Sequence, residues 1–436
     1  MVLSFLFACA GVGAFTVEYD KDVYELTTEV RVDSLLETIA CLSGEKSVKI
    51  DGKKDSIPTR LAVLPGAHDA ALWLAERFEA MGIQAEVREF EVVFPQRTGA
   101  LPLGTDEAEL DALLENAFFS AEAYKMWNVV ATIPGDDAYE VLLTAHYDAY
   151  TDEWQTYTPG ADDNASGVAG VLEAARILSQ GSWKHTLRFV LFGGEELGLF
   201  GSQKYVQDVV DSGMKKMITG VLNLDMIAYD GNEIPQIEIH THPWEETSAE
   251  QGRMLADIID VYGYDIVPEI HIKDAAENSD HSSFWPRLIP AMLLIEDFDD
   301  FTPFYHTTGD LIGTLDTGYM RENVKASLAW TATMAKSDAF IPGVSETPSV
   351  AARIPEIHLP SGVLCAGSWV EIRTPYTVIP VVYDASGRQV AVLESVAPSP
   401  AGKRIELPLS NLAEGIYWVG ISGSPAPVMA KFVLVR

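Results

Sequence analysis

Hydrophobic and polar residues recur along the chain with two different periods, and these periods predict where helices and strands lie. Apolar positions have helical spacing over residues 65–80, and Gly82 ends that pattern. Apolar and polar residues then alternate over residues 85–94, which predicts a strand. Helical spacing returns over residues 106–124, within a stretch, 95–126, that we interpret as an insertion of unknown role.

From Trp127 onward, predicted strands and helices alternate. The strands cover residues 129–133, 141–145, 186–192, 221–226 and 291–295, and the helices cover residues 167–178 and 198–210. This rhythm predicts an α/β domain with a mostly parallel, mixed sheet flanked by helices. In such a domain we expect ligands at the carboxyl ends of the strands.

The pattern changes near Phe340. Residues 341–354 contain prolines and are predicted to be a linker. Residues 355–436 show no helical period, only short apolar runs separated by turns, which predicts a small all-β sandwich of roughly seven strands. We therefore expect a first domain at 17–340 and a second, Ig-like domain at 355–436.

The start of the chain is apolar. Residues 2–15 form a run that is too short to span a bilayer, and residues 1–16 have the character of a signal peptide without its basic region. Leu6–Cys9 also resembles a bacterial lipoprotein box, which would place a lipid on Cys9. No other segment is long and apolar enough to cross a membrane. We expect a secreted or cell-surface bacterial protein, with a periplasmic or lipid-anchored location as the alternative.

The chain is strongly acidic. It has 30 Lys and Arg against 64 Asp and Glu, a formal net charge of −34. Nucleic acid and anionic membranes repel such a polyanion, so neither is an expected partner. Residues 355–436 contain six acidic and six basic residues, so the excess belongs to the first domain. The three cysteines indicate no disulfide framework, although a Cys41–Cys365 bridge stays open.

Polar residues that can bind metals follow several of the predicted strands or open a helix. They occur in five short stretches, at His146 and Asp148, Asp162–Asn164, Glu195 and Glu196, Asp225, and His306. One such residue is typical of a helix cap, but five stretches at one sheet edge predict a common site. Crowded carboxylates repel each other unless cations neutralise them, and imidazole with carboxylate is a ligand set for zinc.

In residue type, order and spacing, these motifs resemble the zinc-dependent aminopeptidases with paired, co-catalytic zinc ions, relatives of the bacterial leucine aminopeptidases. The resemblance runs from about Arg60 to Lys336. It implies the zinc exopeptidase fold, two zinc ions per chain, and peptide or protein N-termini as substrates. It also implies five metal ligands: His146 and Asp225 on the first ion, Glu196 and His306 on the second, and Asp163 bridging both.

The same resemblance assigns three catalytic roles. Glu195 is the general base, which takes a proton from water and passes it to the leaving amine. Asp148 orients His146. Tyr305 holds the oxyanion, since Ala276 occupies the position where some relatives carry a tyrosine. If the backbone at Glu195 and Glu196 is extended, their side chains face opposite sides. The Asp163–Asn164 peptide bond is usually cis in the family.

The C-terminal stretch resembles a second family. Residues 382–390, 412–419 and 431–435 are similar to the Ig-like sorting domains at the C-termini of secreted bacterial proteins. That resemblance implies a role in export or in attachment to the cell surface. An accessory sandwich that only packs on the enzyme is the alternative.

Three other functions stay open beside the aminopeptidase. A glutaminyl cyclase uses a related fold with one zinc ion, and usually carries a tryptophan at the position of Tyr305. A carboxypeptidase on the same fold shares the metal chemistry and differs in the substrate pocket. A non-catalytic binding module usually lacks ligands, and this chain has all five. The preferred N-terminal residue and the oligomeric state are not indicated.

Overall fold

The computed structural model describes two compact units, one within Val17–Ser345 and one that includes Glu346–Arg436. The described residues of the first unit are 17–50, 52–93, 123–232 and 234–341. Those of the second are its strands and a few adjacent residues, between 356 and 434. The expected signal segment, most of the insertion, the linker after Ile341, Cys9 and Cys365 lie outside them. Among the described residues, no helix has the length and apolar character needed to cross a membrane.

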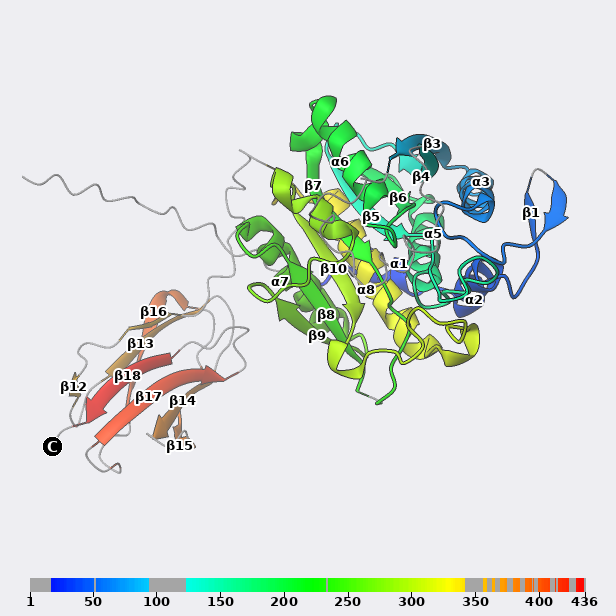
Figure 1. Cartoon of the computed structure of the whole chain (residues 1–436). Coiled ribbons are helices and arrows are strands. Elements are labelled where there is room, and N and C mark those ends of the chain that lie inside the picture. Colours follow the sequence, from blue (N-terminus) through cyan, green and yellow to red (C-terminus); the bar gives the residue numbers. More distant parts are fainter. Residues whose placement is uncertain are drawn as a thin grey trace, which may run out of the picture. The chain divides into compact units, whose positions relative to one another are not determined.

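An eight-stranded mixed sheet forms the centre of the first unit (Figure 1), in the order β3-β4-β6-β5-β7-β10-β8-β9. β6, β5, β7 and β10 are parallel neighbours, whereas β3–β4, β4–β6 and β10–β8 are antiparallel pairs. The strands are β3 Gln84–Val92, β4 Tyr124–Ile133, β5 Glu140–His146, β6 Thr186–Phe192, β7 Ile218–Leu224, β8 Gln236–Thr241, β9 Val267–His271 and β10 Ala291–Glu296. The predicted mixed, mostly parallel sheet is confirmed.

Helices cover both faces of this sheet. The α-helices are α1 Lys21–Thr27, α2 Val32–Leu42, α3 Pro65–Ala80, α5 Ala165–Leu178, α6 Phe200–Asp211, α7 Glu246–Tyr262 and α8 Thr317–Lys336. Short 3₁₀ helices are η1 Met214–Met217, η2 Asp280–Ser283, η3 Trp285–Arg287, η4 Phe298–Asp300 and η5 Ile312–Thr314. A two-stranded ribbon, β1 Val48–Ile50 and β2 Lys53–Asp55, completes the unit.

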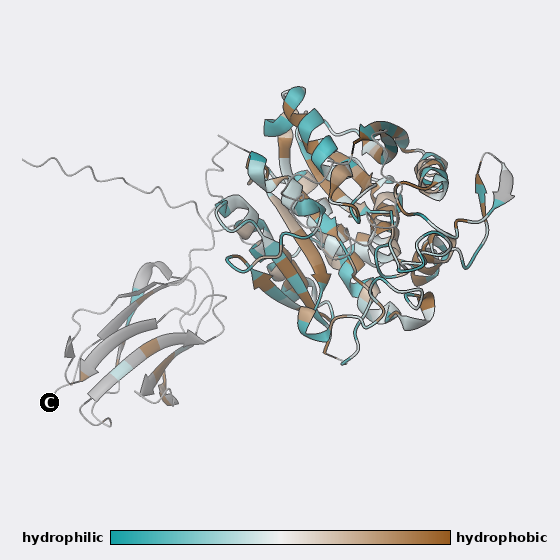
Figure 2. Ribbon diagram, viewed as in Figure 1, coloured by the Kyte–Doolittle hydropathy of each residue, from teal (hydrophilic) through white to brown (hydrophobic). Residues whose placement is uncertain are grey.

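The two faces have separate apolar cores. Helices α5 and α8 pack on β5, and α1 and α2 pack outside them on α8 and α5. On the other face, Tyr205 and Val206 of α6 share a core with Leu142 of β5 and Phe284. Successive strand residues point to opposite faces, so the continuous apolar strands supply both cores. Figure 2 shows this distribution, with hydrophobic residues in the sheet and hydrophilic residues on the outer sides of the helices.

Two boundaries differ from the sequence prediction. Tyr124 begins β4, so the helix predicted over 106–124 is wrong at that residue, and residues 106–122 lie outside the described chain. Helix α6 begins at Phe200, because residues 195–199 form a turn in which the N–H groups of Gly198 and Leu199 donate to Glu195 O. The sequence analysis also did not identify several elements, namely α1, α2, β1, β2, β8, α7, β9 and α8.

The second unit contains two sheets among its described residues. One has the order β11-β13-β16 and the other β12-β18-β17-β14-β15. The strands are β11 Glu356–His358, β12 Val363–Leu364, β13 Trp369–Thr374, β14 Ile379–Asp384, β15 Gln389–Val392, β16 Ser399–Glu406, β17 Gly415–Ser422 and β18 Met429–Leu434. Ile372 and Ile405 of the first sheet share a core with Val382, Val419 and Leu434 of the second. The predicted all-β sandwich is therefore present.

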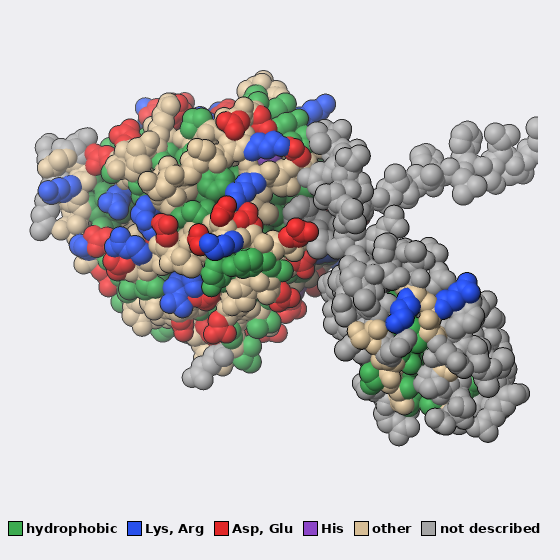
Figure 3. All heavy atoms as spheres, turned by 180° about the vertical axis from the view of Figure 1, so that it is seen from behind, with side chains coloured by type: hydrophobic (Ala, Val, Ile, Leu, Met, Phe, Trp, Pro, Cys, Tyr) green, Lys and Arg blue, Asp and Glu red, His purple; other side chains and the backbone are tan. Residues whose placement is uncertain are grey.

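Acidic and basic side chains are interspersed on the first unit. Figure 3 shows both signs on the face opposite to the view of Figure 1, with small hydrophobic areas between them. Several acids of the first unit are paired at the surface, for example Glu89 with Lys125 and Asp208 with Lys204. Exposed pairs of this kind contribute little to stability. This part of the surface therefore has the mixed charge that is usual for a protein surface exposed to solvent.

Candidate metal centre

The polar residues singled out in the sequence meet at one edge of the central sheet. His146 is the last residue of β5, Asp225 directly follows β7, and Glu195 and Glu196 follow β6. His306 lies in the loop after β10. Because β6, β5, β7 and β10 are parallel neighbours, their carboxyl ends lie side by side. The sheet topology therefore brings side chains from distant parts of the sequence to one place.

Asp163 lies between two histidines. Its Oδ1 is 3.3 Å from His146 Nε2, and its Oδ2 is 3.3 Å from His306 Nε2. His146 Nε2 is also 3.2 Å from Asp225 Oδ1, and His306 Nε2 is 3.0 Å from Glu196 Oε2. One carboxylate thus presents each of its oxygens to a different imidazole, and each imidazole has a second carboxylate beside it.

These separations fit zinc. A tetrahedral zinc ion with bonds of about 2.0–2.1 Å holds its ligand atoms about 3.3 Å apart. The four donor separations around Asp163 lie between 3.0 and 3.3 Å. Ligand atoms of His146, Asp163 and Glu196 all lie within 4.8 Å of one another, and so do those of His146, Glu195 and Asp225. The donor set and its spacing can therefore hold divalent cations.

The main chain fixes the tautomer of His146. Its Nδ1 lies 3.1 Å from the carbonyl oxygen of Asp148, so Nδ1–H donates and the Nε2 lone pair faces Asp163 and Asp225. The Asp148 carboxylate, which the sequence analysis expected at this nitrogen, is 3.7 Å away. Its Oδ1 instead accepts a hydrogen bond from Glu195 N–H at 3.2 Å. Asp148 therefore contacts both a candidate ligand and the candidate base.

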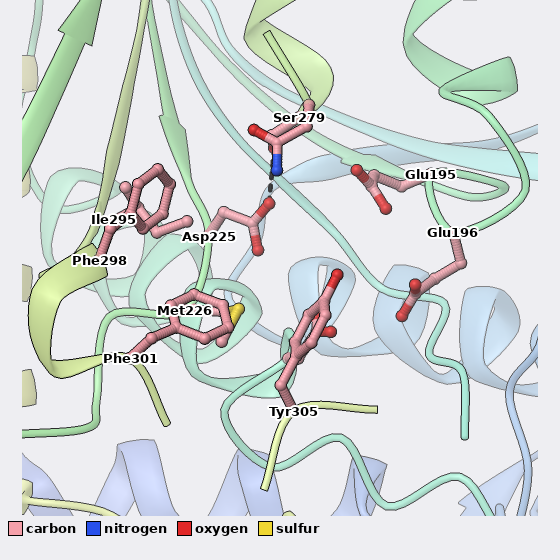
Figure 4. A pocket seen from close by; sticks show the side chains of 11 residues that line it. Glu195, Glu196, Asp225, Met226, Ser279, Ile295, Phe298, Phe301 and Tyr305 are labelled. Carbon is pink, nitrogen blue, oxygen red and sulfur yellow. Dashed lines mark hydrogen bonds between the residues drawn. The ribbon is translucent and has the colours of Figure 1, made fainter. Parts of the chain in front are cut away.

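Glu195 and Glu196 lie in a turn, so the expectation of an extended backbone at this pair is wrong. Gly194 has φ +84° and allows the chain to leave β6 in a tight turn. The two carboxylates nevertheless have different surroundings. Glu196 accepts a hydrogen bond from Tyr150 N–H at 2.9 Å and contacts His306, whereas Glu195 lies with His146 and Asp225. Figure 4 shows both side chains at one pocket.

Burial and crowding shift the pKa values of these groups. Burial raises the pKa of Glu195 well above its ordinary value, against the lowering effect of His146. Burial, followed by the charge of Asp163, raises the pKa of Glu196 to about 7. Burial also acts to raise the pKa of Asp163, but hydrogen bonds to His146 and His306 outweigh it and hold the pKa below its ordinary value. The site therefore concentrates negative charge that cations would stabilise.

The loop that carries Asp163 is anchored on both sides. The Asp163–Asn164 peptide bond is cis, as the resemblance implies. Asn164 caps helix α5 through Gly167 N–H, and its amide donates to Leu224 O at the end of β7. The carboxylate of Asp310 accepts the N–H groups of Asp162 and Asp163, at 2.8 and 3.0 Å. These contacts fix Asp163 relative to β7 and to the loop after His306.

Two residues at the site have positive φ angles without being glycine. Met226 has φ +51° and His306 has φ +55°. Such left-handed conformations are uncommon for these side chains and are found where surrounding contacts impose them. Ser279 donates from Oγ to Asp225 Oδ2 at 2.6 Å and accepts from Asn223 Nδ2 at 2.9 Å. It therefore orients Asp225.

A pocket opens beside the candidate ligands. Figure 4 shows Glu195 and Glu196 on one side and apolar side chains next to Asp225 on the other, with the hydroxyl end of Tyr305 directed into the space between them. The Tyr305 ring stacks on the His306 ring, with centroids 3.7 Å apart, and 39% of the residue is exposed. The lining residues are Asp163, Glu195, Glu196, Asp225, Met226, Asn278, Ser279, Ile295, Phe298, Phe301 and Tyr305.

The sequence analysis missed one buried residue of this region. Arg60 is fully buried, and its guanidinium contacts the main chain of the loops that carry His146 and Asp163. No motif marks it, because its acceptors are carbonyl groups, which every residue has. The signal that could have identified it is weak, a single arginine directly before an apolar run and shortly before a predicted helix.

Comparison with known proteins gives a family match over part of the chain and a shared fold. Residues 128–331 match the description Peptidase family M28. A probable leucine aminopeptidase of Trichophyton verrucosum is 31% identical over 212 residues, 47% of this chain and 56% of the relative. The match thus spans little more than half the length of that curated relative.

Solved structures share the fold at low sequence identity. The LapA aminopeptidase of Legionella pneumophila matches with a TM-score of 0.57 at 22% identity, over 77% of this chain and 80% of that one. A glutaminyl cyclase of Fimbriiglobus ruber matches with a TM-score of 0.54 at 21% identity, over 70% of this chain and 95% of that one. The α/β fold expected from the sequence is therefore confirmed.

Proposed function

We propose that the protein is a zinc-dependent aminopeptidase that holds two zinc ions in one site, and the match of residues 128–331 to peptidase family M28 supports this proposal. The observation that carries the proposal is the position of Asp163. Its Oδ1 lies 3.3 Å from His146 Nε2, and its Oδ2 lies 3.3 Å from His306 Nε2. A shared carboxylate between two imidazole–carboxylate pairs is the arrangement that two neighbouring cations require.

The proposed ligands divide into two sets around Asp163. His146 and Asp225 hold the first ion, and Glu196 and His306 hold the second. When bound, such ions polarise a carbonyl group and ease the deprotonation of water. Asn164 and Asp310 hold the bridging loop, and Ser279 holds Asp225, so each set is oriented by hydrogen bonds outside it.

Glu195 is the proposed general base. Its carboxylate lies with His146 and Asp225, and its raised pKa suits a group that accepts a proton from water and returns it to the leaving amine near neutral pH. Asp148 fixes the backbone of Glu195 through the bond to its N–H. Tyr305, whose hydroxyl end faces the pocket, is the proposed donor to the oxyanion.

The pocket supports an N-terminal substrate. Four acidic residues line it, and no Lys or Arg is among the described lining residues. Two bound zinc ions would neutralise most of this charge, but a C-terminal carboxylate would meet no basic side chain among these residues, which favours an aminopeptidase over a carboxypeptidase. The apolar side, formed by Met226, Ile295, Phe298 and Phe301, fits an apolar first residue such as leucine, methionine or phenylalanine.

Two measurements on the full chain test this function. Elemental analysis after mild dialysis should find about two equivalents of zinc, and removal of zinc should abolish hydrolysis. Aminoacyl reporter substrates should be cleaved, apolar ones fastest, and C-terminal reporters should not. Cyclisation of N-terminal glutamine with a single retained zinc ion would establish the cyclase function instead. A protein that binds no metal and cleaves nothing would be a binding module.

For the second unit we propose a role in export or in attachment to the cell surface. The support is the two-sheet sandwich, with a core of its own, and the resemblance of its sequence to C-terminal sorting domains. A secreted or surface location would also suit an enzyme that trims peptides outside the cell. Expression of the full chain and of a form without residues 355–436 in a secreting host, followed by fractionation, tests the proposal. Equal distribution of both forms would contradict it.

A further inference from the structure

Arg60 is enclosed by main-chain carbonyl groups. The residue is fully buried, and its Nε donates to Tyr147 O at 2.7 Å. Its terminal nitrogens donate to further carbonyl oxygens at distances from 2.5 to 3.5 Å, those of Leu42, Thr158, Pro159, Gly160 and Asp163. These six acceptors all belong to the backbone, so among the described residues this guanidinium acts through carbonyl groups rather than a direct ion pair.

Five of the six acceptors belong to the two segments that carry candidate ligands, and the sixth is the carbonyl of Leu42 at the end of α2. Tyr147 lies between His146 and Asp148, and its carbonyl is bound to Nε. The carbonyls of Gly160 and Asp163 are bound to Nη2, in the loop that presents the bridging carboxylate. One planar side chain therefore joins the end of β5 to the loop before α5.

The loop is shaped around this side chain. Gly160 has φ +45°, and a Cβ atom there would lie 2.1 Å from Asp163 O and 2.5 Å from Arg60 Nη2. The backbone of Arg60 is held in turn, because its N–H donates to Thr158 Oγ1 at 2.8 Å and Thr158 N–H donates to Pro58 O at 2.9 Å. The arginine thus binds the loop through its side chain, and the loop holds the arginine through its backbone.

The charge of Arg60 also bears on the site. Burial lowers the pKa of the guanidinium to about 10, against the opposite effect of the carboxylates of Asp310, Asp163, Glu196 and Asp148. The side chain therefore stays a cation at neutral pH. A positive charge on the protein side of the acidic cluster favours the ionised, ligand-competent form of those carboxylates.

We propose that Arg60 is a positioning residue for the paired cations: it holds His146 and Asp163 at the separation at which both ions can be bound. The inference rests on the proposed function. Arginine suits this task because its planar guanidinium can donate to several carbonyls at once in a fixed geometry. Lysine offers a single ammonium group with three donors. Arg60→Lys keeps the positive charge and removes the planar guanidinium, so it tests the hydrogen bonds to the loops separately from the charge.

The test is metal affinity in the full chain. We expect Arg60→Lys to weaken the binding of at least one zinc ion about 10- to 100-fold in competition with a chelator, as is typical for groups that orient ligands. The absorption spectrum of the cobalt-substituted protein should change as well, because the ligand geometry changes. Arg188→Lys is the matched control. Arg188 is largely buried and paired with Glu140 toward the other end of β5 and β6, so its replacement should leave affinity and spectrum unchanged.

Two results would overturn the proposal. One is an Arg60→Lys protein that binds both ions within twofold of the parent with the same cobalt spectrum. If Arg60→Lys does not fold, Thr158→Val decides, since it removes the hydroxyl that holds the Arg60 backbone; we expect about three- to tenfold weaker binding, and unchanged affinity would refute the role. If the parent protein itself binds no metal, the proposed function fails rather than this inference alone.

Discussion

The carboxylate of Asp148 accepts a hydrogen bond from the main-chain N–H of Glu195, at 3.2 Å. This contact joins the turn after β6 to the end of β5. The carbonyl group of the same aspartate faces His146 Nδ1 at 3.1 Å. One residue thus fixes the ring orientation of a proposed ligand and the backbone of the proposed base.

We expect Asp148→Ala to lower activity more than Asp148→Asn does. The asparagine carbonyl can still accept from Glu195 N–H, whereas alanine leaves that donor without its acceptor. Changes at groups that orient metal ligands typically cost 10- to 100-fold in metal affinity or activity, and we expect losses of about that size for Asp148→Ala. Steady-state kinetics with zinc in excess measure kcat and KM separately. Equal, parent-like kcat values for both variants would contradict this role.

The two glutamates of the turn should respond differently to the same substitution. Glu195→Gln keeps the size and most hydrogen bonding but removes the basic carboxylate, so zinc should be retained while kcat falls about 10²–10⁴-fold. Glu196→Gln should instead weaken one zinc ion, because the carboxylate lies 3.0 Å from His306. Added zinc should then restore part of the activity.

Kinetics and metal titration on both variants check this assignment, with the parent protein as the reference. The reverse result, an active Glu195→Gln protein beside a metal-replete and inactive Glu196→Gln protein, would exchange the two roles.

Protein stripped of metal should lose stability as the pH rises from about 4.5 to 7. Burial raises the pKa of Glu196 from 4.5 to about 7, so its contribution to stability is fully present below pH 4.5 and is lost as the pH rises through 7. For one group this difference corresponds to on the order of 3 kcal/mol. Denaturant unfolding at pH 5 and pH 7.5 measures the effect. Zinc should reduce it, because a bound cation stabilises the carboxylate, and a stripped protein with equal stability at both pH values would contradict the prediction.

A protein that ends at Gly343 should fold, bind zinc and hydrolyse substrate like the full chain. The apolar core of the second unit draws on its own strands, and the first unit has separate cores around its sheet. The thermal midpoint of the first unit and kcat/KM should both match those of the full chain, the latter within about twofold. Aggregation or loss of most activity on truncation would make the sandwich part of the enzyme.

The strands of the parallel sheet core and the residues at their ends could be predicted from the amino-acid pattern alone. Mostly apolar runs such as Val141–Ala145 and Thr186–Phe192 are typical of strands buried on both faces. Parallel strands place their carboxyl ends at one edge, so His146 and Asp225 could be expected to lie together before any coordinates were known. The change to short strands after the linker likewise predicted the second unit.

The distances, and the contacts made by groups without a sequence signature, depend on the folded arrangement of the whole chain. The turn at Glu195 and Glu196 depends on how the chain leaves β6 toward α6, which a local pattern does not record. The apolar side of the pocket combines Met226, after β7, with Phe298 and Phe301, after β10.

Arg60 is the clearest case. Most of its acceptors lie 87 to 103 residues after Arg60 in the sequence, and a carbonyl group has no sequence signature. A sequence pattern predicts helices and strands, because the spacing of apolar side chains follows from local backbone geometry. The choice of carbonyls that a buried guanidinium meets depends instead on how separate segments pack, and that is settled only when the whole chain folds.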